Sequence, residues 1–182
     1  ETSSGPLGSG LSQAVGMAIA DRMERGRQSN RFYYCLMGDG ELNCGQIWEA
    51  AMLAGKEKLH NLIGIIDRNN IQIDGFTEDI MPLEPLKDKW ESFGWHVQEI
   101  DGHNMEAINN AINEAKAIFN KPSMIIAHTI PGKGVDFTER RFEWHGNPPG
   151  KGPADIIPKD QQANEALSEL RTLRGLIKSE HQ

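Results

Sequence analysis

Short apolar runs alternate with amphipathic stretches along most of this chain. The apolar runs at residues 32–37, 62–66 and 123–128 have the length of β-strands, and a further strand is expected at 95–100. Between them, apolar residues recur every three or four positions, which is the spacing of one helix face, and helices are expected at 11–25, about 47–54, 86–93 and 105–119. This alternation predicts an α/β fold with a mostly parallel sheet and helices on both of its faces.

The second half of the chain contains the longest apolar stripe and then changes character. Met105, Ile108, Ile112, Ala115 and Phe119 form that stripe and are expected in the core. Prolines and glycines accumulate from 131 to 159, which predicts a loop, and leucines 167, 170, 173 and 176 predict an amphipathic last helix. We therefore expect residues 1–182 to form a single domain, with a core at about 1–130, an active-site loop at 131–159 and a C-terminal helix at 160–182.

Composition narrows the class of ligand. The 182 residues carry a net charge of −7, which argues against a nucleic acid or a membrane surface as the partner. No run reaches the ~18 apolar residues of a membrane-spanning helix. Cys35 in a predicted strand and Cys44 near a predicted helix start fit a reducing compartment better than a disulfide scaffold. We expect a cytoplasmic protein that binds a small ligand.

The candidate chemistry lies after the first two predicted strands. Gly38-Asp39-Gly40 follows one strand, and Asn69-Asn70 follows the next. Ligands of open α/β sheets collect at the carboxyl ends of the strands, where a following helix also offers N–H groups to a phosphate. Magnesium prefers about six oxygen ligands, so Asp39, Asn69 and the carbonyl of Ile71 predict a magnesium site with room for a diphosphate. Gly-Asp-Gly alone is more typical of an ordinary turn, but the paired motif favours the metal site.

The segment from Gly38 to Gly75 resembles the thiamine diphosphate motif of the transketolases. The resemblance extends to the opening Thr2–Ser12 loop and to Trp144–Pro149, which is similar to the family's later His-Gly-x-Pro element. The sequences at 47–51 and 83–86 are most similar to the amino-terminal subunit of split transketolases, in which two chains share the domains that one chain usually holds. The resemblance covers residues 1 to about 150.

This resemblance implies a thiamine diphosphate-binding fold, with Mg²⁺, or Ca²⁺ or Mn²⁺ in its place. It implies that Asp39, Asn69 and Ile71 bind the metal and that His145 is the catalytic residue, donating hydrogen bonds and moving a proton near the diphosphate and the reacting carbon. The cofactor-binding residues that it implies are Gly5, Leu7, Gly38, Asp39, Gly40, Asn69, Ile71, Ile73 and His145.

The implied activity is transfer of a two-carbon ketol unit from a ketose to an aldose, with sugar phosphates as substrates, as in pentose phosphate metabolism. A C-terminal transketolase subunit would supply the pyrimidine-binding domain, in a homodimer or a heterotetramer. Two departures from the family stand out. The family has a longer segment ahead of the opening loop, so the N-terminal part of its domain is missing here, and Cys44 occupies a position where the family usually has an acid.

Two other functions stay open at this point. The chain is also interpretable as a component of another thiamine diphosphate enzyme, either a deoxyxylulose-phosphate synthase or the α subunit of a 2-oxo acid dehydrogenase. It is further interpretable as a catalytically silent cofactor-binding or regulatory module, an interpretation that the missing N-terminal part of the family domain and Cys44 favour. The sequence leaves the donor sugar, the acceptor sugar and activity without a partner undecided.

Overall fold

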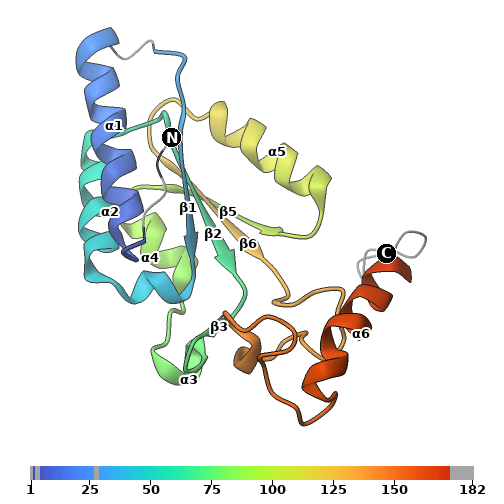
Figure 1. The fold of residues 1–182 in the computed structure, drawn as a ribbon. Helices are drawn as coiled ribbons and strands as arrows, with labels where there is room; N and C mark the ends of the chain where they lie inside the picture. The colour runs from blue at the N-terminus through green and yellow to red at the C-terminus, as the bar shows by residue number, and fades with distance from the viewer. Residues whose placement is uncertain (1, 3–4, 27–28, 173–182) are drawn as a thin grey trace. The chain divides into compact units, whose positions relative to one another are not determined.

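The computed structural model describes residue 2 and residues 5–26 and 29–172. Part of the opening Thr2–Ser12 loop and two leucines of the expected last stripe, Leu173 and Leu176, therefore lie outside the described residues. The chain forms two compact units (Figure 1). Unit 1 comprises Glu1–Arg68 and Leu83–Thr129, and unit 2 comprises Asn69–Pro82 and Ile130–Gln182. The expected single domain stays a prediction, because two compact units can belong to one ligand-binding domain.

Unit 1 is built on a four-stranded parallel sheet in the order β1-β2-β6-β5. The strands are β1 (Tyr33–Gly38), β2 (Leu62–Arg68), β5 (His96–Asp101) and β6 (Ser123–His128). Gly38 of β1 lies opposite Asp67 of β2, and Asp67 lies opposite Ala127 of β6. The carboxyl ends of these three strands therefore lie at nearly the same level of the sheet. The parallel sheet with helices confirms the predicted α/β fold.

Helices cover both faces of this sheet (Figure 1). On one face, α1 (Ser9–Arg25), α2 (Gly45–Glu57) and α4 (Leu86–Ser92) pack on a core that includes Met37, Ile66, Trp90 and Met124. On the other face, α5 (Met105–Lys116) packs Ala111 and Ala115 against Ile63 and Ile125. Buried apolar area is the main stabilising term here.

The predicted stripe on α5 is wrong at both of its ends. Met105 is 73% exposed and Phe119 is 79% exposed. The helix ends at Lys116 with Ala117 as its C-cap, so Phe119 does not continue the helical spacing that predicts a place on the stripe. The small residues Ala111 and Ala115 make the fully buried contact instead, which lets the helix lie close to the sheet.

Strand β1 stands at one edge of the sheet and has two unlike faces. Cys35 and Met37 point into the core, whereas Tyr34 and Leu36 are 47% and 74% exposed. Among the described strands, β1 pairs with β2 alone. The face of β1 that carries Tyr34 and Leu36 therefore presents apolar side chains to solvent.

The described part of unit 2 has little regular structure. It contains the two-stranded antiparallel hairpin β3 (Ile71–Gln72) and β4 (Gly75–Phe76), the short helix α3 (Thr77–Ile80), the 3₁₀ turn η2 (Phe142–Trp144) and α6 (Lys159–Thr172). The ring of Phe76 meets the ring of Phe142 edge-on, with centroids 5.7 Å apart. This aromatic pair joins the hairpin to η2.

The Pro- and Gly-rich loop at 131–159 is irregular apart from η2, as predicted, and α6 holds part of it in place. The fully buried Gln162 accepts from the Gly150 N–H at 2.8 Å and donates to the Ile157 carbonyl at 2.9 Å. Leu167 and Leu170 are about half exposed, at 49% and 47%. The buried side of α6 is thus formed by Gln162 and Ala166 rather than by the predicted leucine stripe.

Candidate functional site

Asp39 is buried at the carboxyl end of β1, in unit 1. Its N–H donates to the Asp67 carbonyl at 3.1 Å, which fixes the turn against the end of β2. Its Oδ1 accepts from the Gly40 N–H at 2.8 Å, and its side chain is 2% exposed. The chain then enters the 3₁₀ turn η1 (Gly40–Asn43) before α2 begins, so the predicted strand-to-helix connection contains one tight turn more than expected.

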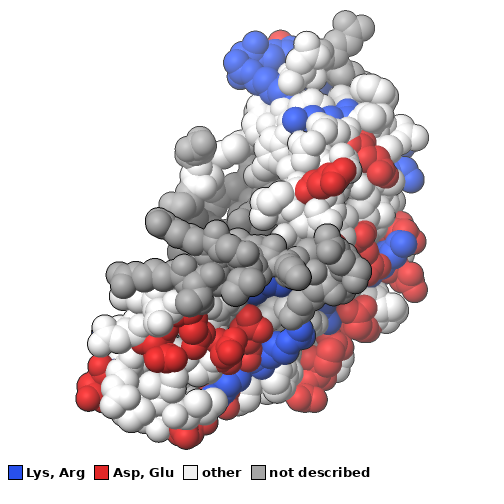
Figure 2. Space-filling view, turned by 90° about the vertical axis from the view of Figure 1, so that its right-hand side faces the viewer, with Lys and Arg blue, Asp and Glu red and all other residues white. Residues whose placement is uncertain are grey.

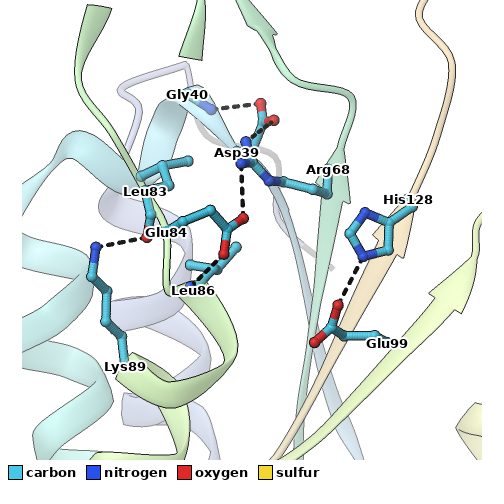
Figure 3. A network of polar contacts seen from close by, with 9 residues as sticks. All are labelled: Asp39, Gly40, Arg68, Leu83, Glu84, Leu86, Lys89, Glu99 and His128. Carbon is cyan, nitrogen blue, oxygen red and sulfur yellow. Dashed lines mark hydrogen bonds and ion pairs between the residues drawn. The ribbon is translucent and has the colours of Figure 1, made fainter. Parts of the chain in front are cut away.

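Arg68 is the last residue of β2, and sequence reasoning does not identify it as part of the site. Its Nη1 donates to Asp39 Oδ2 at 3.0 Å, and its Nη2 donates to Glu84 Oε1 at 3.0 Å. The other oxygen of Glu84 accepts from the Leu86 N–H at 2.8 Å, as Figure 3 shows. The guanidinium therefore lies between two carboxylates, and the one from Asp39 is the predicted metal ligand.

Glu41 ties the opening loop to the Asp39 turn. Its two carboxylate oxygens accept from the Gly8 N–H at 2.7 Å and from the Gly38 N–H at 3.2 Å. Gly8 has φ +85°, and a Cβ there would come within 2.7 Å of the Cβ of Cys44. Only glycine satisfies both conditions, so the loop that carries Gly5 and Leu7 is held close to the Gly38–Asp39 turn.

A cavity of about 710 Å³ opens beside this loop within unit 1. Leu7, which is 67% exposed, lines it together with Glu41, Tyr34 and Leu36. Small-molecule sites have volumes of this order. The Gly38 and Gly40 N–H groups already donate to Glu41 and Asp39. What Gly38 offers a ligand is room, because a Cβ at that position would meet no atom within 4 Å.

Cys35 lies in β1 beneath this surface and behaves as a packing residue. Burial, helped by the negative charge of Glu41, raises the pKa of the Cys35 thiol to about 11. The thiol is therefore protonated near neutral pH. Cys35 and Cys44 are both free, in line with the prediction that they form no disulfide.

In unit 2, Asn69 and Ile71 are directly linked. Asn69 Oδ1 accepts from the Ile71 N–H at 3.1 Å. Asn70 adopts φ +66°, a conformation that Asn tolerates better than most residues, and its carbonyl accepts from the Thr77 N–H at 3.0 Å. The side-chain oxygen of Asn69 and the backbone of Ile71 therefore belong to one tight bend.

His145 follows η2, and its N–H donates to the Phe142 carbonyl at 2.8 Å. Its side chain is exposed. Because Phe142 also meets Phe76, unit 2 connects the bend at Ile71 with the turn at His145. Ile73, the remaining predicted cofactor contact in this unit, is 72% exposed.

The predicted site residues thus form two sets, each built within its own unit. Among the described residues, no three His, Cys, Asp or Glu side chains gather as a metal site. The predicted donors are instead a carboxylate, an amide oxygen and a backbone carbonyl, which is the hard oxygen set that suits Mg²⁺. This donor chemistry and the negative charge of Asp39 fit a divalent cation. The Arg68 guanidinium, which donates to Asp39 Oδ2, places a competing positive charge at the same oxygen.

The face shown in Figure 2 carries charges of both signs. On the face shown in Figure 2, Lys and Arg side chains lie beside Asp and Glu side chains, so the described part of that face has no broad basic patch of the kind that binds a phosphate backbone. None of the described helices is both long enough and apolar enough to span a membrane.

Residues 1–162 match the protein family described as "Transketolase, thiamine diphosphate binding domain". The chain is 51% identical over 145 residues to the 6-deoxy-6-sulfo-D-fructose transketolase subunit of a Clostridium species, covering 80% of this chain and 52% of that protein. It is 42% identical over 170 residues to an apulose-4-phosphate transketolase subunit of Phocaeicola vulgatus, covering 93% and 56%. The chain spans about half the length of these curated relatives.

Solved transketolases have the same fold. The crystal structure of transketolase from Campylobacter jejuni superposes with a TM-score of 0.72 at 32% sequence identity, covering 94% of this chain and 30% of that one. A transketolase from Leishmania mexicana superposes with a TM-score of 0.66 at 28% identity, covering 94% and 30%.

Proposed function

This chain belongs to the family of transketolase thiamine diphosphate-binding domains, and we propose that it is the cofactor-binding part of a transketolase completed by a second chain. The proposed reaction transfers a two-carbon ketol unit from a ketose to an aldose, with sugar phosphates as substrates. Two relatives that are named as transketolase subunits support this proposal. We propose that the partner chain carries the pyrimidine-binding domain and that the assembly is a homodimer or a heterotetramer.

One observation carries the proposal. The strands β1 and β2 are parallel neighbours that end level, with Gly38 opposite Asp67, and the buried Asp39 follows the first of them. This edge of a parallel sheet is where α/β proteins bind their ligands. A buried carboxylate at that place supplies the charged oxygen ligand that a metal-diphosphate site requires.

The proposed roles follow from the residues. Asp39, the amide oxygen of Asn69 and the carbonyl of Ile71 would hold Mg²⁺, or Ca²⁺ or Mn²⁺ in its place. Gly38 and Gly40 would leave room for the diphosphate, Gly5 and Leu7 would contact the cofactor rings, and Ile73 would also contact the cofactor. When bound, thiamine diphosphate supplies the nucleophilic carbon that breaks and forms the C–C bonds of the sugars. His145 would hold a proton on its imidazole near the substrate.

The first test is calorimetric titration of the purified chain with thiamine diphosphate, with Mg²⁺ and again with a chelator. Wild-type chain should bind only with Mg²⁺. Asp39→Asn should lose this binding, because it removes the charge of the cation ligand while keeping its shape. Asp21→Asn is the matched control, since Asp21 is also a buried carboxylate paired with an arginine, Arg25, but lies in α1.

Equal affinity of wild type and Asp39→Asn for the cofactor would exclude Asp39 as a metal ligand. If the wild-type chain binds nothing alone, the titration is repeated with the candidate partner chain. Turnover of a ketose and an aldose that appears only on mixing the two chains is the result expected of a split enzyme.

A second candidate function, a catalytically silent cofactor-binding module, rests on Cys44. This residue replaces an acid of the family and packs against Gly8. Cofactor binding without turnover in the presence of the partner would favour that function. We propose a cytoplasmic location on the basis of the two free cysteines.

A further inference from the structure

Arg68 is a buried cation whose surroundings are built around its charge. The side chains of Arg68 and Asp39 are each 2% exposed, and that of Glu84 is 56% exposed. Removing a guanidinium from water is costly unless its donors are satisfied by charged partners. Here two different nitrogens of the fork reach two different carboxylates, an arrangement that a lysine ammonium cannot reproduce with the same geometry.

The second anchor of Arg68 is itself fixed. Glu84 Oε2 accepts from the Leu86 N–H at the start of α4. Lys89 of the same helix donates to the Leu83 carbonyl at 2.6 Å, so the segment around Glu84 is tied to α4 on both sides (Figure 3). Glu84 therefore anchors the guanidinium between Asp39 and the start of α4.

We propose that Arg68 is a positioning residue that serves as the built-in counter-ion of Asp39 in the metal-free chain and so couples divalent cation binding to diphosphate binding. This inference rests on the proposed function. A bare divalent cation that approaches Asp39 meets the positive charge of Arg68, which opposes its binding. An anionic diphosphate that arrives with the cation offsets this repulsion, so the two bind much better together than the cation binds alone.

The coupling has a direct signature in cation affinity. Replacing Arg68 by the neutral Gln, which retains hydrogen-bonding capacity, should raise the affinity for Mn²⁺ alone by about tenfold or more, and Arg68→Met should act in the same direction. Arg68→Lys keeps the charge and should stay near wild type. The ratio of Mn²⁺ affinities with and without thiamine diphosphate should be correspondingly smaller in Arg68→Gln than in wild type, because the charge that opposes the bare cation is then absent.

The experiment measures free Mn²⁺ by electron paramagnetic resonance during titration of the purified chain without cofactor, and then with it. Arg22→Met is the matched control, because Arg22 forms an ion pair with Glu57 within the same unit, so the variant loses the same charge away from Asp39. Its Mn²⁺ affinity should equal that of wild type. Circular dichroism establishes that each variant is folded, and a variant that does not fold is replaced by the other neutral one.

The proposal is overturned if Arg68→Gln binds Mn²⁺ alone no better than wild type, including the case in which neither binds. It is also overturned if Arg68→Lys gains as much affinity as Arg68→Gln, because loss of geometry and not of charge would then be responsible. Failure of the proposed function looks different: wild type would bind no thiamine diphosphate with Mg²⁺, alone or with the partner chain.

Discussion

Replacing Gly55 with alanine should destabilise unit 1, although alanine is the better helix former. Gly55 lies in α2 with its Cα against the backbone of Phe93. A Cβ at Gly55 would lie 1.9 Å from the Phe93 carbonyl oxygen and 3.1 Å from the carbonyl carbon. Because these are backbone atoms, no rotamer change relieves the contact. Either α2 or the segment after α4 must move until the 1.9 Å separation reaches at least 3.0 Å.

The magnitude follows from two opposing terms. Overpacking costs about 1–3 kcal/mol, and a clash with backbone belongs at the upper end of that range. The gain in helix propensity from Gly to Ala is about 1 kcal/mol. The net loss is therefore about 2 kcal/mol, which corresponds to a fall of about 4–8 °C in Tm for a chain of this size.

Gly16→Ala provides the matched control. Gly16 is also within a helix, α1, but a Cβ there would meet no atom within 4 Å. This variant should gain up to about 1 kcal/mol, so the two alanine variants should differ by about 3 kcal/mol. Urea unfolding followed by tryptophan fluorescence is suitable, because Trp48, Trp90 and Trp95 all belong to unit 1. If Gly55→Ala is as stable as wild type, or if both variants shift stability alike, the packing argument is refuted.

Three further perturbations test other parts of unit 1. Asn104→Ala should lower the free energy of unfolding by about 1 kcal/mol, because the Asn104 side chain accepts from two N–H groups at the start of α5. Asn109→Ala, in the middle of that helix, should change urea unfolding little. Equal losses of stability in the two variants would contradict the helix cap. Cys35 of the folded chain should resist iodoacetamide at pH 8 and react only as the pH approaches its pKa of about 11, so rapid alkylation seen by mass spectrometry would contradict its burial. A hydrogen bond from Arg22, and after it the interaction with Lys56, lowers the pKa of Glu57. Glu57 therefore stabilises the fold above its unfolded-state pKa, and this contribution is lost as the pH falls through the lower folded-state pKa. Arg22→Met should make the Tm of the chain fall less steeply at acid pH, and Tm–pH curves of wild type and variant that run parallel would contradict the ion pair.

The strands and helices of unit 1 are predictable because their patterns are local. The central strands β2 and β6 follow mostly apolar runs, as expected where both faces of a parallel sheet are covered. The edge strand β5 mixes apolar and polar residues, and each helix has its own spacing of apolar residues. The boundaries shift by up to three residues: β1 is expected at 32–37 and runs from Tyr33 to Gly38, and α2 is expected to end at about residue 54 and ends at Glu57. Local spacing fails where a helix ends early, so it places Phe119 in the core although α5 ends before it.

The polar partners of Asp39 are not predictable by such reasoning. Arg68 is 29 residues from Asp39 in the sequence, and Glu84 is a further 16 residues along. Nothing in a local pattern indicates that these three side chains meet. Glu41 is likewise visible only as part of the Gly38–Glu41 motif, because its contact with Gly8 spans 33 residues. The positions of Asp39 and Asn69 after strands are predictable, whereas their assignment to one metal site stays a prediction.

The exposed face of β1 has a consequence for handling the protein. Residues 33–38 contain neither a charged residue nor a proline, and edge strands without such residues invite pairing with strands of other molecules. Leu36 and Tyr34 add apolar surface beside that edge. When the chain is prepared by itself at high concentration, self-association should begin at this strand, and a lysine in place of Leu36 is the change that should delay it.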